Sequence, residues 1–213
     1  MPSIQPLFPV PFAFEQHPDP ARLNAALRAL FLARDSDADR NPNPYTERNA
    51  ALFESRFDLF GWPQPEVAEL REFCLSRTLQ VIQQLNRHPP ELMRNMRLAV
   101  ESWFHVTRRN GWFGVHNHPN ASWSGVYCVD AGHPDADVED SGKLTFLHPN
   151  PEAGMHTDRG NESLVPPFHV AHAGYVLAAG QLVLFPSWLM HHVTPFVGDG
   201  ERITVAFNCK VLP

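Results

Sequence analysis

Cysteine is scarce in this chain, and no apolar run is long. The 213 residues include three cysteines, Cys74, Cys128 and Cys209, at wide and irregular intervals. This spacing excludes a disulfide framework and a cysteine-rich zinc site, and unpaired cysteines are typical of a reducing compartment. No apolar stretch approaches the length of a membrane span, and the N-terminal MPSIQPLFPVPFAF lacks the basic start and unbroken apolar core of a signal peptide. We therefore expect a soluble, cytoplasmic protein.

An excess of positive charge is also lacking. The formal net charge is −6, whereas proteins that bind nucleic acid through the phosphates need a basic surface. We expect neither nucleic acid nor a membrane among the partners, and a homodimer is the commonest oligomeric state to expect. Histidine, by contrast, is frequent, with 12 residues. The composition therefore directs attention to a site built from imidazoles.

Residues 1–97 have the pattern of a helical region. Pro20 can occupy the first position of a helix, and leucines then recur at helical spacing as far as Phe31. A second helix is predicted from Pro65 to about Leu85, because its apolar residues also follow a helical period. The segment between them, DSDADRNPNPYTERN, is polar and contains prolines, so it predicts a loop.

Residues 98–213 consist of short runs rich in β-branched and aromatic residues, with turn residues between them. The seven runs are AVESWFHVT, GWFGVHNH, SWSGVYCV, GKLTFLH, FHVAHAGYVL, QLVLFPSW and RITVAFNCKVL. This pattern indicates a barrel or a double-sheet jelly roll. We predict a mainly β, α+β protein in one structural domain, with the helices of 1–97 packed outside a β core over 98–213. Two irregular connections, 131–141 and 149–167, have no assigned role, although the second is long enough for a lid.

Two histidines that stand two residues apart are the most informative local feature. Alternate side chains of a strand leave the same face, so His116 and His118 of VHNHPN would lie about 7 Å apart along one strand. A distant strand carrying His191 would complete a cluster of imidazoles, which are preferred ligands of iron, zinc, copper and nickel. A solvated strand end also explains the first two histidines. Asp135 or Asp137 could supply a carboxylate ligand to such a site.

Three segments of the second half of the chain resemble those of a known family. HNHPNASWSGVYCV, GQLVLFPSWLMHHVTP and ERITVAFN are similar to the HxHPN…SGVYY, LVLFPSWLxHxVxP and RISIAFN motifs of a bacterial family of 2-oxoglutarate/Fe(II) oxygenases. The resemblance extends from Trp103 to the end of the chain. It implies a double-stranded β-helix with Fe(II) at one mouth of the barrel, 2-oxoglutarate and O2 as co-substrates, and the hydroxylation of an unidentified substrate, such as a small molecule.

The resemblance also implies roles for individual residues. The two metal-binding histidines of the superfamily correspond to His116 and His191, and its carboxylate ligand corresponds to His118. Three neutral imidazoles leave more net positive charge on Fe(II) than two imidazoles and a carboxylate do. Arg202 corresponds to the basic residue that binds the far carboxylate of 2-oxoglutarate, which a guanidinium can hold through two parallel hydrogen bonds. Further co-substrate contacts are expected on the interior faces of the strands, from Ser124, Cys128 and Asn208, where relatives usually have tyrosine in place of Cys128.

Two alternatives stay open at this point. A three-histidine dioxygenase would bind its substrate directly to iron and would not use 2-oxoglutarate. A jelly-roll module could bind a metal or a ligand without catalysis. The remaining histidines near the predicted strands are expected to be hydrogen-bonded residues of the fold; these are His105, His148, His169 and His172.

Overall fold

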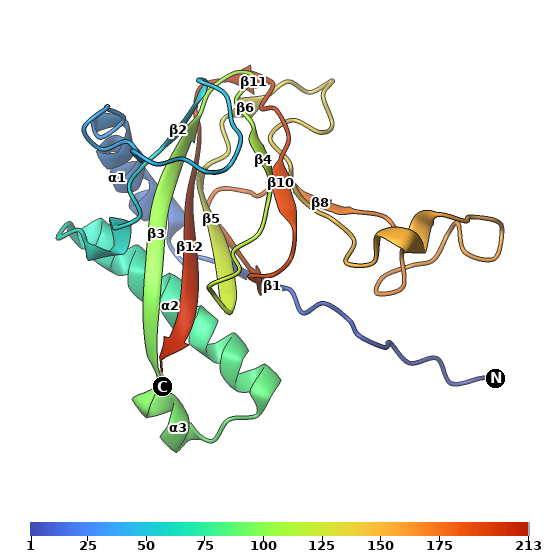
Figure 1. The fold of residues 1–213 in the computed structure, drawn as a ribbon. Helices are drawn as coiled ribbons and strands as arrows, with labels where there is room; N and C mark the ends of the chain where they lie inside the picture. Colours follow the sequence, from blue (N-terminus) through green and yellow to red (C-terminus); the bar gives the residue numbers. More distant parts are fainter. Residues whose placement is uncertain (213) are drawn as a thin grey trace.

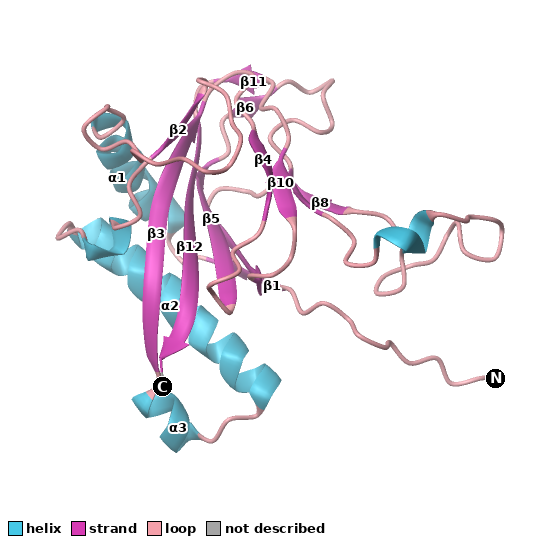
Figure 2. Ribbon diagram, viewed as in Figure 1, coloured by secondary structure: helices cyan, strands magenta, loops and turns pink. Residues whose placement is uncertain are grey.

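Two antiparallel sheets face one another in the computed structural model, which describes residues 1–212 (Figures 1 and 2). The larger sheet has the order β1-β9-β5-β12-β3-β2, with bounds Ala13–Gln16, Gln181–Pro186, Trp123–Asp130, Arg202–Leu212, Arg97–Thr107 and Leu52–Glu54. The smaller sheet has the order β4-β10-β7-β8, with bounds Phe113–His116, His191–Val193, Leu144–Phe146 and Ala173–Tyr175. A short ribbon pairs β6 (His133–Pro134) with β11 (Gly198–Asp199).

The chain passes repeatedly from one sheet to the other. β3, β5, β9 and β12 lie in the larger sheet, while β4, β7, β8 and β10 lie in the smaller one. This winding is that of a double-stranded β-helix, a form of jelly roll. The predicted fold class is confirmed, and each of the seven predicted runs overlaps one of these strands.

Two helices cover the outer face of the larger sheet (Figure 2). α1 (Pro20–Ala33) begins with proline, whose missing N–H is not needed in the first turn. Its Phe31 stacks on Phe104 of β3 with ring centroids 4.3 Å apart. α2 (Pro65–Asn86) packs into the same apolar core. Shorter helical elements are η1 (Leu59–Gly61), α3 (Pro90–Asn95) and η2 (Pro151–Gly154).

The N-terminal region also contributes strands, which its helical pattern does not reveal. β1 pairs with β9 at one edge of the larger sheet, and β2 pairs with β3 at the other. Both strands are short, with four and three residues, and they depend on a neighbouring strand for their hydrogen bonds. The larger sheet therefore takes strands from both sides of the predicted boundary at residue 97.

None of the helices within residues 1–212 combines the length and the apolar character needed to cross a bilayer.

The space between the two sheets is apolar over most of its length. It is filled by a cluster that consists of Cys128, Leu144, Phe146, Leu177, Val183, Phe185 and Leu189. β4 and β10 pair in an antiparallel manner, so the last residue of β4 lies beside the first residue of β10. Polar side chains replace the apolar ones at this end of the barrel, and they form the candidate site.

Candidate metal centre

Strand pairing brings the first two histidines together. His116 is the last residue of β4, His191 is the first residue of β10, and the two are direct partners in the antiparallel pairing. Their ring centroids lie 4.2 Å apart. Residues distant in the chain thus meet because the fold places the ends of their strands side by side.

His118 reaches the cluster from a loop, and not by alternation along a strand as predicted. β4 ends at His116, so His118 does not alternate along the strand but lies in the loop that follows. Its backbone N–H donates a 2.8 Å hydrogen bond to the carbonyl of Ser187, which fixes this loop against the opposite sheet. The His118 ring lies 4.9 Å from that of His116 and 5.3 Å from that of His191.

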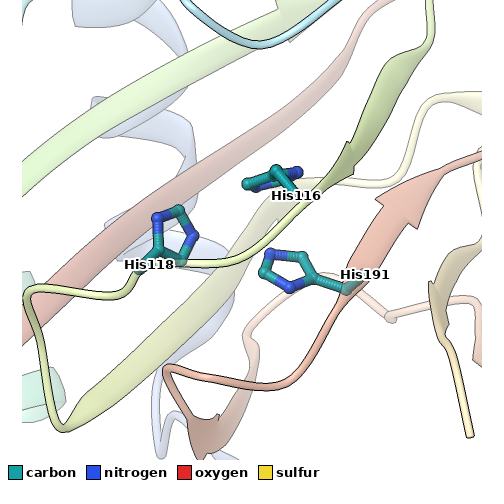
Figure 3. Close-up of side chains that lie close together, drawn as sticks. All are labelled: His116, His118 and His191. Carbon is teal, nitrogen blue, oxygen red and sulfur yellow. The ribbon is translucent and has the colours of Figure 1, made fainter. Parts of the chain in front are cut away.

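The three rings face a common point (Figure 3). One ring nitrogen of each histidine lies within 4.8 Å of the others. In His116 and His191 the Nδ1 atom is 2.8 Å from the carbonyl oxygen two residues earlier, which belongs to Gly114 and Leu189 respectively. A carbonyl only accepts, so Nδ1 carries the proton and Nε2 keeps a lone pair for a ligand bond.

Burial keeps all three imidazoles neutral. It lowers the pKa of His191 well below its ordinary value, and lowers the pKa of His116 in the same direction. Burial, together with the neighbouring His116, lowers the pKa of His118 to about 3. Neutral imidazole is the form that binds a metal. The cluster is therefore in its metal-binding protonation state at neutral pH.

A buried arginine shares the cavity of the three histidines. Arg202, the first residue of β12, is 6% exposed. No hydrogen bond or ion pair within residues 1–212 involves its guanidinium. Burial lowers the pKa of Arg202, and the Cys128 thiol opposes this shift. Gly142, at φ 60°, leaves room for its stem, because a Cβ there would lie 2.9 Å from the Arg202 Cδ.

The unpaired charge of Arg202 is one criterion for whether the cavity suits 2-oxoglutarate. Burying a guanidinium without a counter-ion costs several kcal/mol, so an unpaired one in a cavity indicates a site for an anion. A dicarboxylate would bind Arg202 at one end and reach toward the histidines with the other. The cavity volume is about 30 Å³, which is room for a few water molecules. The cavity is therefore smaller than 2-oxoglutarate in this structure.

Ser124 and Asn208, two of the residues predicted to contact the co-substrate, are hydrogen-bonded to each other. The Ser124 hydroxyl donates a 2.7 Å hydrogen bond to Oδ1 of Asn208, and it lies 2.8 Å from the hydroxyl of Ser187. Both residues line the cavity. Because the Ser187 carbonyl holds His118, this chain of hydrogen bonds supports the third histidine. A co-substrate contact from either side chain stays a prediction.

Cys128 is not in the cavity wall. It lies in the apolar cluster between the sheets, and burial raises the pKa of its thiol to about 11. The alternation that puts it on the same face as Ser124 is correct, but its position is deeper in the barrel.

No aspartate of the acidic loop supplies a carboxylate. Asp135 forms an ion pair with Arg109 at 3.1 Å on the surface, and Asp137 is exposed. Within residues 1–212, the group of side chains that could hold a metal ion contains the three histidines alone.

A buried carboxylate that the sequence analysis missed lies beside the cavity. Glu54 of β2 is 2% exposed, and its Oε2 is 3.1 Å from Nε2 of His105, a residue of the cavity wall. Its Oε1 accepts hydrogen bonds from Asn41 at 2.6 Å and from Arg48 at 2.5 Å. Burial alone would raise the pKa of Glu54, but His105, Asn41 and Arg48 together lower it to about 2. His105 is a hydrogen-bonded residue of the fold, as predicted.

Comparison with known sequences identifies the class. Residues 101–208 match the family described as "Putative 2OG-Fe(II) oxygenase". The match covers half of the chain, and the chain belongs to this family. The protein is an oxygenase whose cofactors are Fe(II) and 2-oxoglutarate, as the sequence motifs implied. Comparison with curated proteins gives no match.

Solved structures share the fold. A prolyl-4-hydroxylase from Pseudomonas putida is 18% identical, with a TM-score of 0.61 over 94% of this chain and 92% of that one. AviO1 from Streptomyces viridochromogenes Tue57 is 15% identical, with a TM-score of 0.60 over 95% and 90%. HygX from Streptomyces hygroscopicus, solved with nickel, 2-oxoglutarate and hygromycin B, is 15% identical, with a TM-score of 0.59 over 94% and 83%.

Proposed function

We propose that His116, His118 and His191 bind the Fe(II) and that Arg202 binds the far carboxylate of 2-oxoglutarate, in a hydroxylase with an unidentified substrate. One observation supports this most directly. Three neutral imidazoles and an unpaired arginine line the same buried cavity. This is a donor set for a cation beside a receptor for an anion, and 2-oxoglutarate needs both.

The protein supplies positions and charges for the reaction. Bound Fe(II) and 2-oxoglutarate supply the family's chemistry, in which O2 converts 2-oxoglutarate to succinate and CO2 and hydroxylates a C–H bond of the substrate. The Gly114 and Leu189 carbonyls hold the Nε2 atoms of His116 and His191 toward the metal position. Arg202 orients the co-substrate, and the apolar cluster behind it excludes water.

The third histidine changes the charge of the centre. A carboxylate in place of His118 would neutralise one of the two positive charges of Fe(II), whereas an imidazole neutralises none. Dianionic 2-oxoglutarate therefore supplies the first negative charge in this site. We expect the co-substrate to tighten metal binding, and the metal to tighten co-substrate binding by the same factor.

Anaerobic reconstitution with Fe(II) tests the proposal. Equilibrium titration should show one Fe(II) per chain, and oxygen should then give succinate from 2-oxoglutarate. His191→Ala should lose Fe(II) binding and succinate formation. His156→Ala, which changes an exposed loop histidine, should keep both activities. Iron-loaded protein that neither binds nor consumes 2-oxoglutarate would favour the three-histidine dioxygenase. Protein that binds no transition metal would favour the non-catalytic module.

We also propose a cellular location and an oligomeric state for the protein. The three cysteines are free and buried, which supports a reducing cytoplasm. A homodimer is the expected state, and sedimentation velocity measures it directly.

A further inference from the structure

An apolar groove lies next to Leu189 and Phe146, two neighbours of His191. It lies between the N-terminal segment, residues 6–12, and the connection from β7 to β8, residues 147–172, and its volume is about 720 Å³. Both segments leave the barrel on the same side (Figure 1). This volume falls in the range of sites for small organic molecules, roughly 300–1,000 Å³.

The wall of the groove includes two neighbours of His191. Its wall includes Leu189, whose carbonyl accepts the Nδ1 hydrogen bond of His191. It also includes Phe146, whose ring centroid is 5.7 Å from that of His191. The groove and the cavity of the three histidines share no lining residue, and Leu189 and Phe146, each 3% exposed, are the residues through which the groove meets His191.

The lining of the groove has no charged side chain of the Asp, Glu, Lys or Arg type. Large apolar side chains on both segments are open to solvent, with Leu7 80% exposed, Phe8 88% exposed and Phe168 36% exposed. Exposed apolar surface of this kind marks a binding site, because water covers it at a cost in free energy. In His169, which also lines the groove, Nδ1 is buried without a hydrogen-bond partner among the described residues, contrary to our expectation for this histidine.

We propose that the groove binds the body of an uncharged, mainly apolar small-molecule substrate that carries one hydrogen-bonding group for His169. The lack of charge in the wall selects against ionic ligands, because a buried charge without a partner is unfavourable. We assign this molecule as the substrate because the groove borders Leu189 and Phe146, the two neighbours through which it meets His191. Only that last step rests on the proposed metal role of the histidines.

A neutral apolar dye, N-phenyl-1-naphthylamine, tests the groove in the metal-free protein. Its fluorescence should rise on binding at one site per chain. Phe168→Asp places a carboxylate in the wall and should weaken binding by about tenfold. Val138→Asp is the matched control, because Val138 has the same 36% exposure but lies in the acidic loop, and it should leave binding unchanged.

Equal binding by the wild type and Phe168→Asp would overturn the proposal. So would loss of dye binding as the protein concentration rises, because a second copy of the chain would then cover the groove. A further arm tests position: Mn²⁺ added to the wild type should broaden the proton resonances of the bound dye, and His191→Ala should abolish this effect. Dye binding without broadening, in protein shown to hold Mn²⁺, would place the site away from the centre and overturn the assignment to substrate. Loss of 2-oxoglutarate turnover with dye binding intact would count against the proposed function alone.

Discussion

Two buried polar clusters share the barrel interior, and they differ in whether their charges are paired. In one, Glu54 accepts hydrogen bonds from Asn41 and Arg48 and pairs with His105. In the other, the three histidines turn ring nitrogens toward a common point, and Arg202 has no counter-ion within residues 1–212. A buried cluster with every group paired can be part of the fold by itself. One with unpaired groups is complete only with a ligand.

The two buried arginines make the contrast sharpest. The side chain of Arg48 is 10% exposed and Arg202 as a whole residue is 6% exposed, but only Arg48 lies against a carboxylate. Removing Arg48 would take a charged partner from the buried Glu54, which would keep His105 and Asn41, whereas removing Arg202 would eliminate an unpaired buried charge. The same type of substitution should therefore have opposite consequences for stability and for ligand binding.

The largest effect is expected at the cluster of the three histidines and Arg202. His191→Ala removes a ligand from the proposed centre and should weaken Fe(II) binding by about 1,000-fold, equivalent to about 4 kcal/mol. His105→Ala removes a histidine from the paired cluster and should leave the Fe(II) affinity of the folded protein within about tenfold of wild type. Anaerobic equilibrium titration measures both. Equal losses in the two variants would erase the distinction between the clusters.

The next effect concerns stability. Arg48→Met should lower the free energy of unfolding by up to about 3 kcal/mol, because the buried carboxylate of Glu54 loses a charged hydrogen-bond donor and keeps only His105 and Asn41. Arg202→Met should leave this free energy unchanged or raise it, because it removes an uncompensated charge. Urea denaturation of the metal-free proteins gives both values. A loss in Arg202→Met as large as that in Arg48→Met would show that the cavity already satisfies this guanidinium.

Acid should affect the paired cluster through Glu54. Its pKa falls from an ordinary 4.5 to about 2 on folding, so the unfolded chain holds the proton more tightly than the folded one. The group contributes about 3 kcal/mol of stability above pH 5, and this contribution is lost as the pH falls toward 2. In Glu54→Gln, the free energy of unfolding should decline less over this range. Parallel pH profiles for the two proteins would contradict the pairing.

The smallest effect is on the co-substrate. Arg202→Met should weaken binding of 2-oxoglutarate to the Fe(II)-loaded protein by about 100-fold, because two charge-assisted hydrogen bonds are lost. Arg202→Lys keeps the charge but not the planar pair of donors, and it should lose about tenfold. Calorimetric titration under anaerobic conditions measures these affinities. Unchanged binding in Arg202→Met would mean that the arginine does not contact the co-substrate.

The sequence predicted those parts of the molecule that depend on local patterns. The helix after Pro20, the helix after Pro65 and the seven runs of the β core could be located from periodicity and turn residues. His116 and His191 could be brought together because motifs of a known family pair them. These features are carried by local sequence patterns or by the motifs of the family.

The remainder depends on contacts between distant segments. β1 and β2 are strands because β9 and β3 offer them hydrogen bonds. Glu54 lies in a short apolar run, and only the approach of Arg48 and His105 makes it a stable buried charge. The position of His118 also followed from tertiary structure, since a hydrogen bond to Ser187, rather than strand alternation, brings it to the cluster.

X-ray absorption spectroscopy of the Fe(II)-loaded protein tests the central claim most directly, because it counts the imidazoles bound to the iron. We predict three imidazole ligands in the wild type and two in His118→Ala. A count of two in the wild type, or a spectrum that His118→Ala leaves unchanged, would contradict the account.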